Sequence, residues 1–262
     1  MRVTFSFTFK NKIVLPVNYN YQLQSFFYKL FDKKIANFLH NKGYRYGSRS
    51  FKLFTFSSIS GKSIYDARNK ILIFSPPIKI LFSTPIDDII CSLSRNIIIN
   101  EKFNLAGNEI FIESISVHKK IENFKDKIII KTLSPITIYS TFLNSMKKKK
   151  TYYYSPTEDE FSKLIYENAR KKYEILKTHK SDEYNQENEN LNLTIKPIKC
   201  NPKKHMKVVK YKNFLIKAWH GIFELSGSPE LIKTVYYTGI GSKNPQGFGC
   251  VEVIGKSLLS YD

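Results

Sequence analysis

The side chains best suited to move a proton near neutral pH are five histidines: His40, His118, His179, His205 and His220. Imidazole has an unperturbed pKa of about 6.5, so it can act as acid or base. His40 opens the segment HNKGYRYGSRSFK, residues 40–52, which is rich in lysine, arginine and tyrosine. In such a loop it would face a bound phosphate chain, where lysine or tyrosine could stabilise developing charge. Alternatively, His40 ends a helix and is favoured there by the helix dipole.

The sequence carries no recognisable metal-binding spacing. It has neither Cys-x-x-Cys nor His-x-x-x-His. The acidic clusters at 87–88 and 158–160 fall in the first turns of expected helices, where the helix dipole accounts for them. We therefore predict no metal ion and no other cofactor.

A second candidate is the glycine-rich segment GIGSKNPQGFG, residues 239–249. It does not follow a strand and lacks the closing Gly-Lys-Ser/Thr of a P-loop, which argues against nucleotide hydrolysis. Its backbone N–H groups and Lys243 could cradle a phosphate or follow an RNA backbone. Alternatively, Gly241 ends a helix while Gly247 and Gly249 form a bulge. Phe248 could pack in the core or meet a base.

The overall charge points to a polyanionic partner. The chain has 42 Lys and Arg against 22 Asp and Glu, a formal charge of +20, and nucleic acid is the first candidate. Aromatic residues make up 15% of the chain, and they can stack on unpaired bases or fill the core. No apolar run approaches the roughly 20 residues that span a bilayer, and the three cysteines are scattered. We expect a cytoplasmic protein with reduced thiols and no membrane association.

The order of expected elements repeats. The first half predicts a strand over 3–9, a helix over 21–41, strands over 52–57, 70–74 and 78–83, a helix from Pro85 and a strand over 109–118. Within 21–41, Asp32 could cap a second short helix that continues through Leu39. The second half predicts strands over 127–139, 191–198, 208–225 and 248–254. Its helices begin at the capping box Ser155-Pro156-Thr157-Glu158 and at Ser228-Pro229-Glu230. This β-α-β-β-α-β order predicts an α+β fold of two tandem ferredoxin-like (RRM-like) domains, residues 1–122 and 123–262.

Five segments together resemble the CRISPR-associated endoribonucleases that cut repeat RNA into guide RNAs. In chain order they are LPVNYNYQLQSFFYKLF, KLFTFS, TLSPITI, AWHGIFELSGSPELIKTVYYTGIGSKNPQGFG and, overlapping the last, GIGSKNPQGFGCVEV. The resemblance implies two ferredoxin-like domains and metal-independent RNA cleavage. In that reaction a 2′-hydroxyl attacks the neighbouring phosphate, leaving a 2′,3′-cyclic phosphate and a 5′-hydroxyl.

The same resemblance implies roles for single residues. His40 matches the family's catalytic histidine, and Tyr28 and Lys52 match a tyrosine and a lysine that some members use. Taken by themselves, Tyr28 could be a core residue and Lys52 an exposed strand residue, and Tyr44 and Tyr46 are rivals for the tyrosine role. We expect RNA to be bound by Tyr44, Arg45, Tyr46, Arg49, Gly239, Gly241, Lys243, Gly247, Phe248 and Gly249.

The sequence therefore favours an endoribonuclease that acts on CRISPR repeat RNA. The alternative is a non-catalytic, RRM-like protein that binds repeat RNA within a CRISPR effector complex, whose other proteins are then candidate partners. Monomer and homodimer are both compatible with the sequence.

Overall fold

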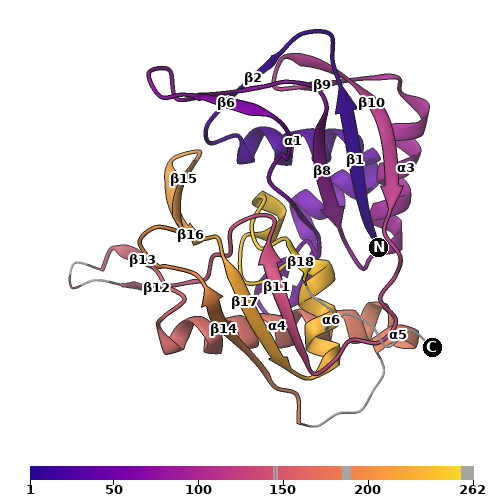
Figure 1. The fold of residues 1–262 in the computed structure, drawn as a ribbon. Coiled ribbons are helices and arrows are strands. Elements are labelled where there is room, and N and C mark those ends of the chain that lie inside the picture. The colour runs from indigo at the N-terminus through magenta and orange to yellow at the C-terminus, as the bar shows by residue number, and fades with distance from the viewer. Residues whose placement is uncertain (144, 146, 185–189, 255–262) are drawn as a thin grey trace.

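Two antiparallel sheets, each with helices packed on it, make up the molecule (Figure 1). The structure is a computed structural model and describes residues 1–143, 145, 147–184 and 190–254.

The first sheet has the strand order β5-β8-β1-β10-β9. Its strands are β1 (Arg2–Thr8), β5 (Thr55–Phe56), β8 (Ile78–Ser83), β9 (Lys102–Leu105) and β10 (Asn108–Val117), and its helices are α1 (Asn20–Leu30) and α3 (Asp87–Ile99). Phe5 and Phe7 alternate along β1 and are fully buried. The ring centres of Phe7 and of Phe26 on α1 lie 5.7 Å apart, in an edge-to-face arrangement. The apolar alternation of the strand and the apolar stripe of the helix therefore face each other, as the sequence predicts.

The second sheet repeats this plan in the order β14-β17-β11-β18. Its strands are β11 (Lys127–Thr132), β14 (Leu193–Lys199), β17 (Ile222–Gly227) and β18 (Val251–Val253), and its helices are α4 (Asp159–His179) and α6 (Pro229–Thr238). If the four main strands of each half are numbered in chain order, both sheets place them side by side as second, third, first and fourth. Both halves are ferredoxin-like, and the fold is α+β.

Smaller elements are inserted between these strands and helices. They are a sheet of β2 (Ile13–Pro16), β7 (Ile71–Phe74) and β6 (Ser63–Asp66); the hairpins β3 (Tyr44–Tyr46)/β4 (Arg49–Phe51), β12 (Tyr139–Leu143)/β13 (Lys149–Tyr153) and β15 (Met206–Tyr211)/β16 (Phe214–Trp219); and the short helices α2 (Lys33–Asn37), η1 (Phe38–Lys42, a π-helical turn), α5 (Ser181–Tyr184) and η2 (Asn244–Gln246).

The predicted boundaries have mixed outcomes. The second short helix expected from Asp32 within 21–41 is confirmed, because the backbone is extended at Phe31 and Asp32 and α2 begins at Lys33 with Asp32 at its N-cap. The Asp32 carboxylate does not cap α2; it accepts hydrogen bonds from Arg95 and Asn96 of α3, at 3.4 and 2.9 Å. The strand expected over 127–139 ends at Thr132.

The two predicted helix starts have different outcomes. Glu158 accepts a hydrogen bond from the Ser155 backbone N–H at 2.6 Å, half of the predicted capping box, but α4 begins only at Asp159. The start of α6 is confirmed, with Ser228 at the N-cap and Pro229 in the first turn. The polar composition of residues 181–190 predicts a loop; Ser181–Tyr184 instead form α5, and residues 185–189 lie outside the described residues.

The two sheets share a core. One cluster of buried apolar side chains runs from Val3 of β1 to Val251 of β18. The Arg2 side chain, 3% exposed, crosses between them and donates hydrogen bonds to Tyr236 O and Val251 O at 3.2 and 2.5 Å. Residues 118–126 connect β10 to β11. The domain boundary between residues 122 and 123 falls in this segment and stays a prediction.

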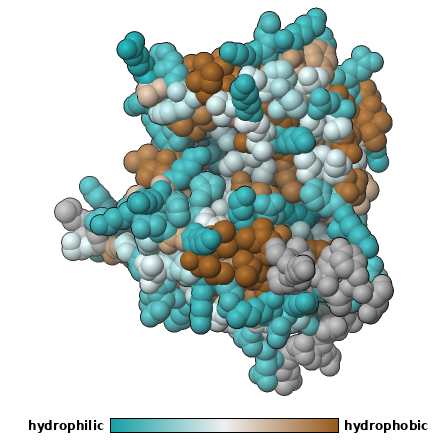
Figure 2. All heavy atoms as spheres, in the orientation of Figure 1, coloured by the Kyte–Doolittle hydropathy of each residue, from teal (hydrophilic) through white to brown (hydrophobic). Residues whose placement is uncertain are grey.

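The surface fits the composition. Hydrophilic side chains cover much of the face seen in Figure 2, with an apolar area in its lower half. Within the described part of the chain, no helix is long and apolar enough to cross a membrane.

Candidate functional site

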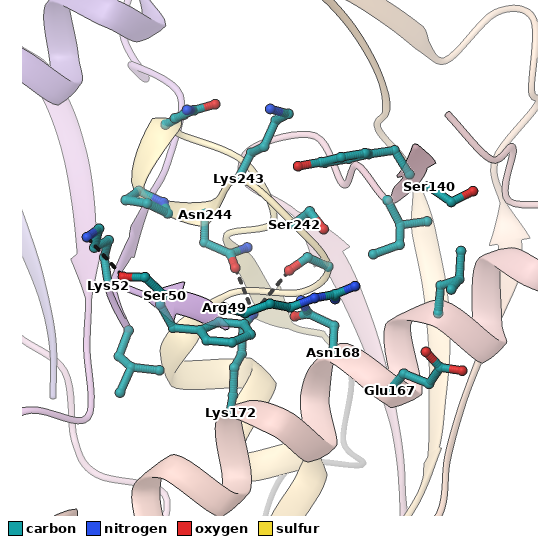
Figure 3. A pocket seen from close by; sticks show the side chains of 18 of the residues that line it. Arg49, Ser50, Lys52, Ser140, Glu167, Asn168, Lys172, Ser242, Lys243 and Asn244 are labelled. Atoms are coloured by element: carbon teal, nitrogen blue, oxygen red, sulfur yellow. Dashed lines mark hydrogen bonds between the residues drawn. The ribbon is translucent and has the colours of Figure 1, made fainter. Parts of the chain in front are cut away.

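A cleft of about 600 Å³ lies where the two halves of the chain meet, a size typical of ligand sites. The first half contributes residues 49–53, from β4 and the segment after it. The second half contributes residues 138–141 at the start of β12, one face of α4, and residues 241–246 of the glycine-rich segment. Figure 3 shows Lys52 and Ser50 on one side of this cleft, Ser140 and Glu167 on the other, and Asn244 and Lys172 between them.

The charges around the cleft favour an anion. Arg49, Lys52 and Lys243 line it, and Glu167 is the one carboxylate among its lining residues. The Lys243 ammonium lies 4.9 Å from the centre of the Tyr139 ring, a cation–π contact. Burial lowers the pKa of both Lys52 and Lys243, as expected for cations held in a concave surface. Bound phosphate groups would offset the mutual repulsion of Arg49, Lys52 and Lys243.

A buried lysine forms the floor of the cleft. Lys172 of α4 is 2% exposed, and its Nζ donates hydrogen bonds to Gly239 O, Gly241 O and Asn244 Oδ1 at 2.8, 3.1 and 2.7 Å. Burial lowers the pKa of Lys172 to about 7. Asn244 extends the network, because its Nδ2 donates to Ile240 O and Phe248 O, both at 3.0 Å. These hydrogen bonds from Lys172 and Asn244 fix the backbone of the glycine-rich segment.

The predicted glycines Gly239, Gly241, Gly247 and Gly249 are all buried and all have positive φ. A Cβ on Gly241 would lie 2.5 Å from Thr137 O, and one on Gly247 would lie 2.6 Å from the Phe56 ring. Close packing therefore accounts for glycine at these positions. Direct RNA contact by the four glycines stays a prediction.

Phe248 is fully buried, in a small cluster with Val209, Tyr211, Ile216 and Ala218 of the β15/β16 hairpin. Of the two interpretations left open for its ring, the core interpretation is the one that the structure supports, because a fully buried ring offers no face to a base. Lys243, half-buried and in a left-handed conformation at φ +59, lies at the cleft.

Residues of the first half of the chain also form hydrogen bonds to the glycine-rich segment. Asn20, at the start of α1, donates from Nδ2 to Gln246 O and Gly247 O at 2.9 and 3.2 Å. Thr55 of β5 donates from Oγ1 to Phe248 O at 3.0 Å. The glycine-rich segment is therefore part of the contact between the two sheets.

The three predicted catalytic residues all belong to the first half of the chain. His40 is exposed on the η1 turn, and its Nδ1 lies 2.9 Å from Asn41 Oδ1. Gly43 follows this turn, and the position of a Cβ on Gly43 is 2.8 Å from Lys52 Nζ. The Lys52 ammonium donates to Ser50 Oγ at 3.2 Å. Lys52 lines the cleft, whereas His40 and Tyr28 are not among its lining residues.

Tyr28 is half-buried on α1, where its ring contacts Phe31 and Phe54. Burial raises the pKa of Tyr28 to about 12. Its hydroxyl is therefore protonated at neutral pH and can donate a hydrogen bond.

The predicted RNA-binding residues of the β3/β4 hairpin point in different directions. Tyr44 is buried against Phe38 and against His179 of α4, with ring centres 5.1 Å apart in both pairs. Arg45 is exposed. The Arg170 guanidinium of α4 donates hydrogen bonds to the hydroxyl oxygens of Tyr166 and Tyr46, which raises the pKa of Arg170. The hairpin thus docks on α4, and Arg49 reaches the cleft.

The remaining histidines have local partners. His220 Nδ1 lies 3.1 Å from Thr132 Oγ1, and burial lowers the pKa of His220 to about 4. His118 Nε2 lies 2.7 Å from Thr4 Oγ1. Among residues 1–143, 145, 147–184 and 190–254, no three His, Cys, Asp or Glu side chains gather where they could hold a metal ion.

Sequence reasoning missed Lys172, Asn168, Asn244 and Tyr139 as residues of the site. For Lys172 a signal existed. The buried stripe of α4 runs through Phe161, Ile165, Ala169 and Leu176, and continuing it by three or four residues reaches position 172. A lysine inside a buried stripe indicates a cation with an internal partner.

Comparisons with known proteins cover nearly the whole chain. The family model of CRISPR associated protein Cas6, C-terminal, matches residues 117–253. The CRISPR-associated endoribonuclease Cas6 1 of Methanocaldococcus jannaschii is 26% identical over 96% of this chain and 92% of its own length. The CRISPR-associated endoribonuclease Cas6 of Pyrococcus furiosus is 28% identical over 92% of this chain and 84% of its own.

The fold agrees with these matches. A solved structure described as CRISPR associated protein Cas6 superposes with a TM-score of 0.76 at 25% identity, covering 97% of this chain and 99% of that chain. Its similarity includes both sheets, whereas the family model covers the C-terminal half. The chain belongs to the Cas6 family.

Proposed function

We propose that this protein is an endoribonuclease that cleaves CRISPR repeat RNA into guide RNAs. The observation that carries the proposal is the cationic cleft between the two sheets, in a chain whose relatives bear the name endoribonuclease Cas6. Arg49, Lys52 and Lys243 would neutralise RNA phosphates there, and the formal charge of +20 adds long-range attraction.

The proposed reaction is a metal-independent transesterification. The ribose 2′-oxygen attacks the adjacent phosphorus, the bond from phosphorus to the 5′-oxygen breaks, and a 2′,3′-cyclic phosphate and a 5′-hydroxyl result. One proton leaves the 2′-hydroxyl and one reaches the departing 5′-oxygen, so the strand breaks without consuming water. His40 would carry out a proton transfer, for which an exposed imidazole on the η1 turn is accessible.

Two further residues would support the imidazole. Lys52, whose ammonium lies beside Gly43, would stabilise negative charge on the phosphorane-like transition state. Tyr28 would donate a hydrogen bond from its neutral hydroxyl. Lys52→Ala and Tyr28→Phe test these roles separately, and Tyr28→Phe keeps the ring that packs on Phe31 and Phe54.

RNA binding would extend beyond the catalytic residues. Exposed Arg45 and half-exposed Tyr46 would meet RNA outside the cleft, and the backbone of the glycine-rich segment would follow the strand next to Lys243. Repeat RNA is the proposed partner, and other proteins of a CRISPR effector complex are candidate partners.

The test is cleavage of the host's repeat RNA by wild type, His40→Ala and the matched control His205→Ala. His205 is also exposed, but its Nδ1 accepts a hydrogen bond from the Asn201 backbone N–H within the second half of the chain. We expect His40→Ala to slow cleavage by about 10²–10⁴-fold, the typical contribution of a proton-transfer residue, and His205→Ala to cut normally. Wild type should cut in excess EDTA, and a 2′-deoxy substitution at the scissile nucleotide should stop it.

A second candidate function is RNA binding without cleavage. It is favoured by the position of His40, which is not among the residues that line the cleft. Tight binding of repeat RNA with no product after long incubation would select this function. Unchanged cleavage by His40→Ala would instead contradict the active-site assignment, and loss of cleavage in EDTA would contradict the metal-independent mechanism.

A further inference from the structure

The feature with an unassigned role is the Lys172 ammonium beneath the glycine-rich segment. None of the ion pairs between described residues includes Lys172, although its side chain is almost completely buried. Its three acceptors are instead Gly239 O, Gly241 O and Asn244 Oδ1. A protonated lysine has three N–H donors, so this arrangement satisfies all of them.

Only the charged form fits these contacts. A neutral amine keeps two N–H groups and gains a lone pair, which would face one of the three oxygens. A buried acceptor without a donor is costly. Deprotonation of Lys172 would therefore loosen the backbone at Gly239 and Gly241 or turn the Asn244 amide away, and Asn244 is the residue that bridges Ile240 O and Phe248 O.

The groups that face Lys172 across the cleft are mostly cationic. Lys243 comes from the glycine-rich segment, Arg49 and Lys52 come from the first half of the chain, and Tyr139 comes from β12. On α4 itself the carboxylate of Glu167 lines the cleft and is paired with Lys171 at 3.9 Å. An RNA phosphate in this cleft would add the negative charge that the surroundings of Lys172 lack.

We propose that Lys172 is a positioning residue that takes up a proton as RNA binds, so that RNA binding and the locking of the glycine-rich segment are one coupled event. This inference rests on the proposed function, because it requires RNA in the cleft. Burial lowers the pKa of Lys172 to about 7 in the free protein, and a nearby phosphate raises it. By linkage, affinity for RNA then falls as pH rises above 7.

The test is calorimetry of repeat RNA binding in two buffers of different ionisation enthalpy, between pH 7 and 9. Non-cleavable repeat RNA with the 2′-deoxy substitution keeps the measurement to binding. We expect wild type to take up close to one proton more than K172R at pH 8. Its affinity should fall by up to about tenfold per pH unit in this range. K172R carries a permanent charge. Its RNA affinity should therefore lack the pH dependence that comes from position 172, while it still binds tightly at pH 7.

Two further variants complete the design. K172M should bind weakly throughout the range and lack the slope. K163M, which removes an exposed lysine of the same helix, should behave as wild type. Burial also lowers the pKa of Lys52 and Lys243, so the quantity that decides is the difference between wild type and K172R, in which both of those lysines remain.

Equal proton uptake and equal slopes in wild type and K172R would overturn the inference and leave the proposed function intact. If no variant binds repeat RNA, the proposed function fails, and hydrogen exchange of residues 239–249 in the free protein still tests the lock. After correction for intrinsic exchange, we expect faster opening at pH 8.5 than at pH 6.5 in wild type. A ¹³C-lysine NMR titration provides a test without variants, and a spectrum in which every lysine titrates above pH 9.5 would overturn the inference.

Discussion

The packing of the glycine-rich segment predicts that Gly241→Ala is far more damaging than an alanine at an unobstructed glycine. Gly241 has φ +70, and its added Cβ would lie 2.5 Å from Thr137 O. Gly107, in the turn between β9 and β10, has φ +87 and nothing within 4 Å of an added Cβ. Both substitutions place alanine in the left-handed region, which costs about 1–2 kcal/mol. Only Gly241→Ala adds a collision.

The collision has consequences that can be added up. Thr137 O accepts the Ser242 N–H at 2.8 Å, and separating the two strands would lose that bond, worth about 1 kcal/mol net. The same movement displaces Gly241 O from the Lys172 ammonium, a charge-assisted bond worth about 1.5–3 kcal/mol. We therefore expect a loss of about 3.5–6 kcal/mol for Gly241→Ala against about 1–2 kcal/mol for Gly107→Ala.

Urea unfolding of the two variants beside wild type measures these losses. The free energy of unfolding should separate the variants by at least about 2 kcal/mol, which follows from the bonds lost at Thr137 and Lys172. RNA affinity at pH 7 should fall for Gly241→Ala and stay unchanged for Gly107→Ala. Equal losses of stability in the two variants would refute the reasoning, because left-handed strain alone would then account for both.

Three further substitutions test other contacts. Phe248→Ala should cost about 3–5 kcal/mol, since it empties a fully buried site, and limited proteolysis should then cut the β15/β16 hairpin first. Burial lowers the pKa of His220 to about 4, so between pH 6.5 and 4 the unfolded chain binds a proton that the folded chain does not. The free energy of unfolding should therefore fall by about 3 kcal/mol over this range. In urea unfolding, His220→Gln should make the free energy of unfolding less dependent on pH between 6.5 and 4. Burial alone would raise the pKa of Glu183, but Lys180 and Lys120 lower it to about 2. Glu183→Gln should lower the free energy of unfolding by about 1 kcal/mol at pH 7. The difference in this free energy between the variant and wild type should shrink as pH falls from 4.5 towards 2.

Local sequence patterns predicted those features that depend on near neighbours in the chain. The stripe of α1 and the start of α6 at Ser228-Pro229 need only the spacing of apolar residues and a capping position. The strand–helix order likewise indicated two ferredoxin-like halves. A second short helix after Asp32 also followed from the local pattern, but the partners of the Asp32 carboxylate did not, because Arg95 and Asn96 lie on α3.

The site shows the same division. The basic loop after His40 and the glycine-rich segment were recognisable from composition. Whether the glycines bind a ligand or fill close contacts depends on neighbours such as Thr137 and Phe56, which are far away in the sequence. Lys172 was overlooked because lysine is rarely buried, and its acceptors are backbone carbonyls on a different element.

Anchorage of the glycine-rich segment from both sides has a mechanical consequence. Asn20 and Thr55 hold it from one sheet and Lys172 holds it from the other. Rotation of one half as a rigid body against the other would break the hydrogen bonds from Asn20 and Thr55, so the two halves move together while the segment is locked. Release of the segment would then also free the halves to change the width of the cleft, which ties the shape that RNA meets to the contacts of Lys172.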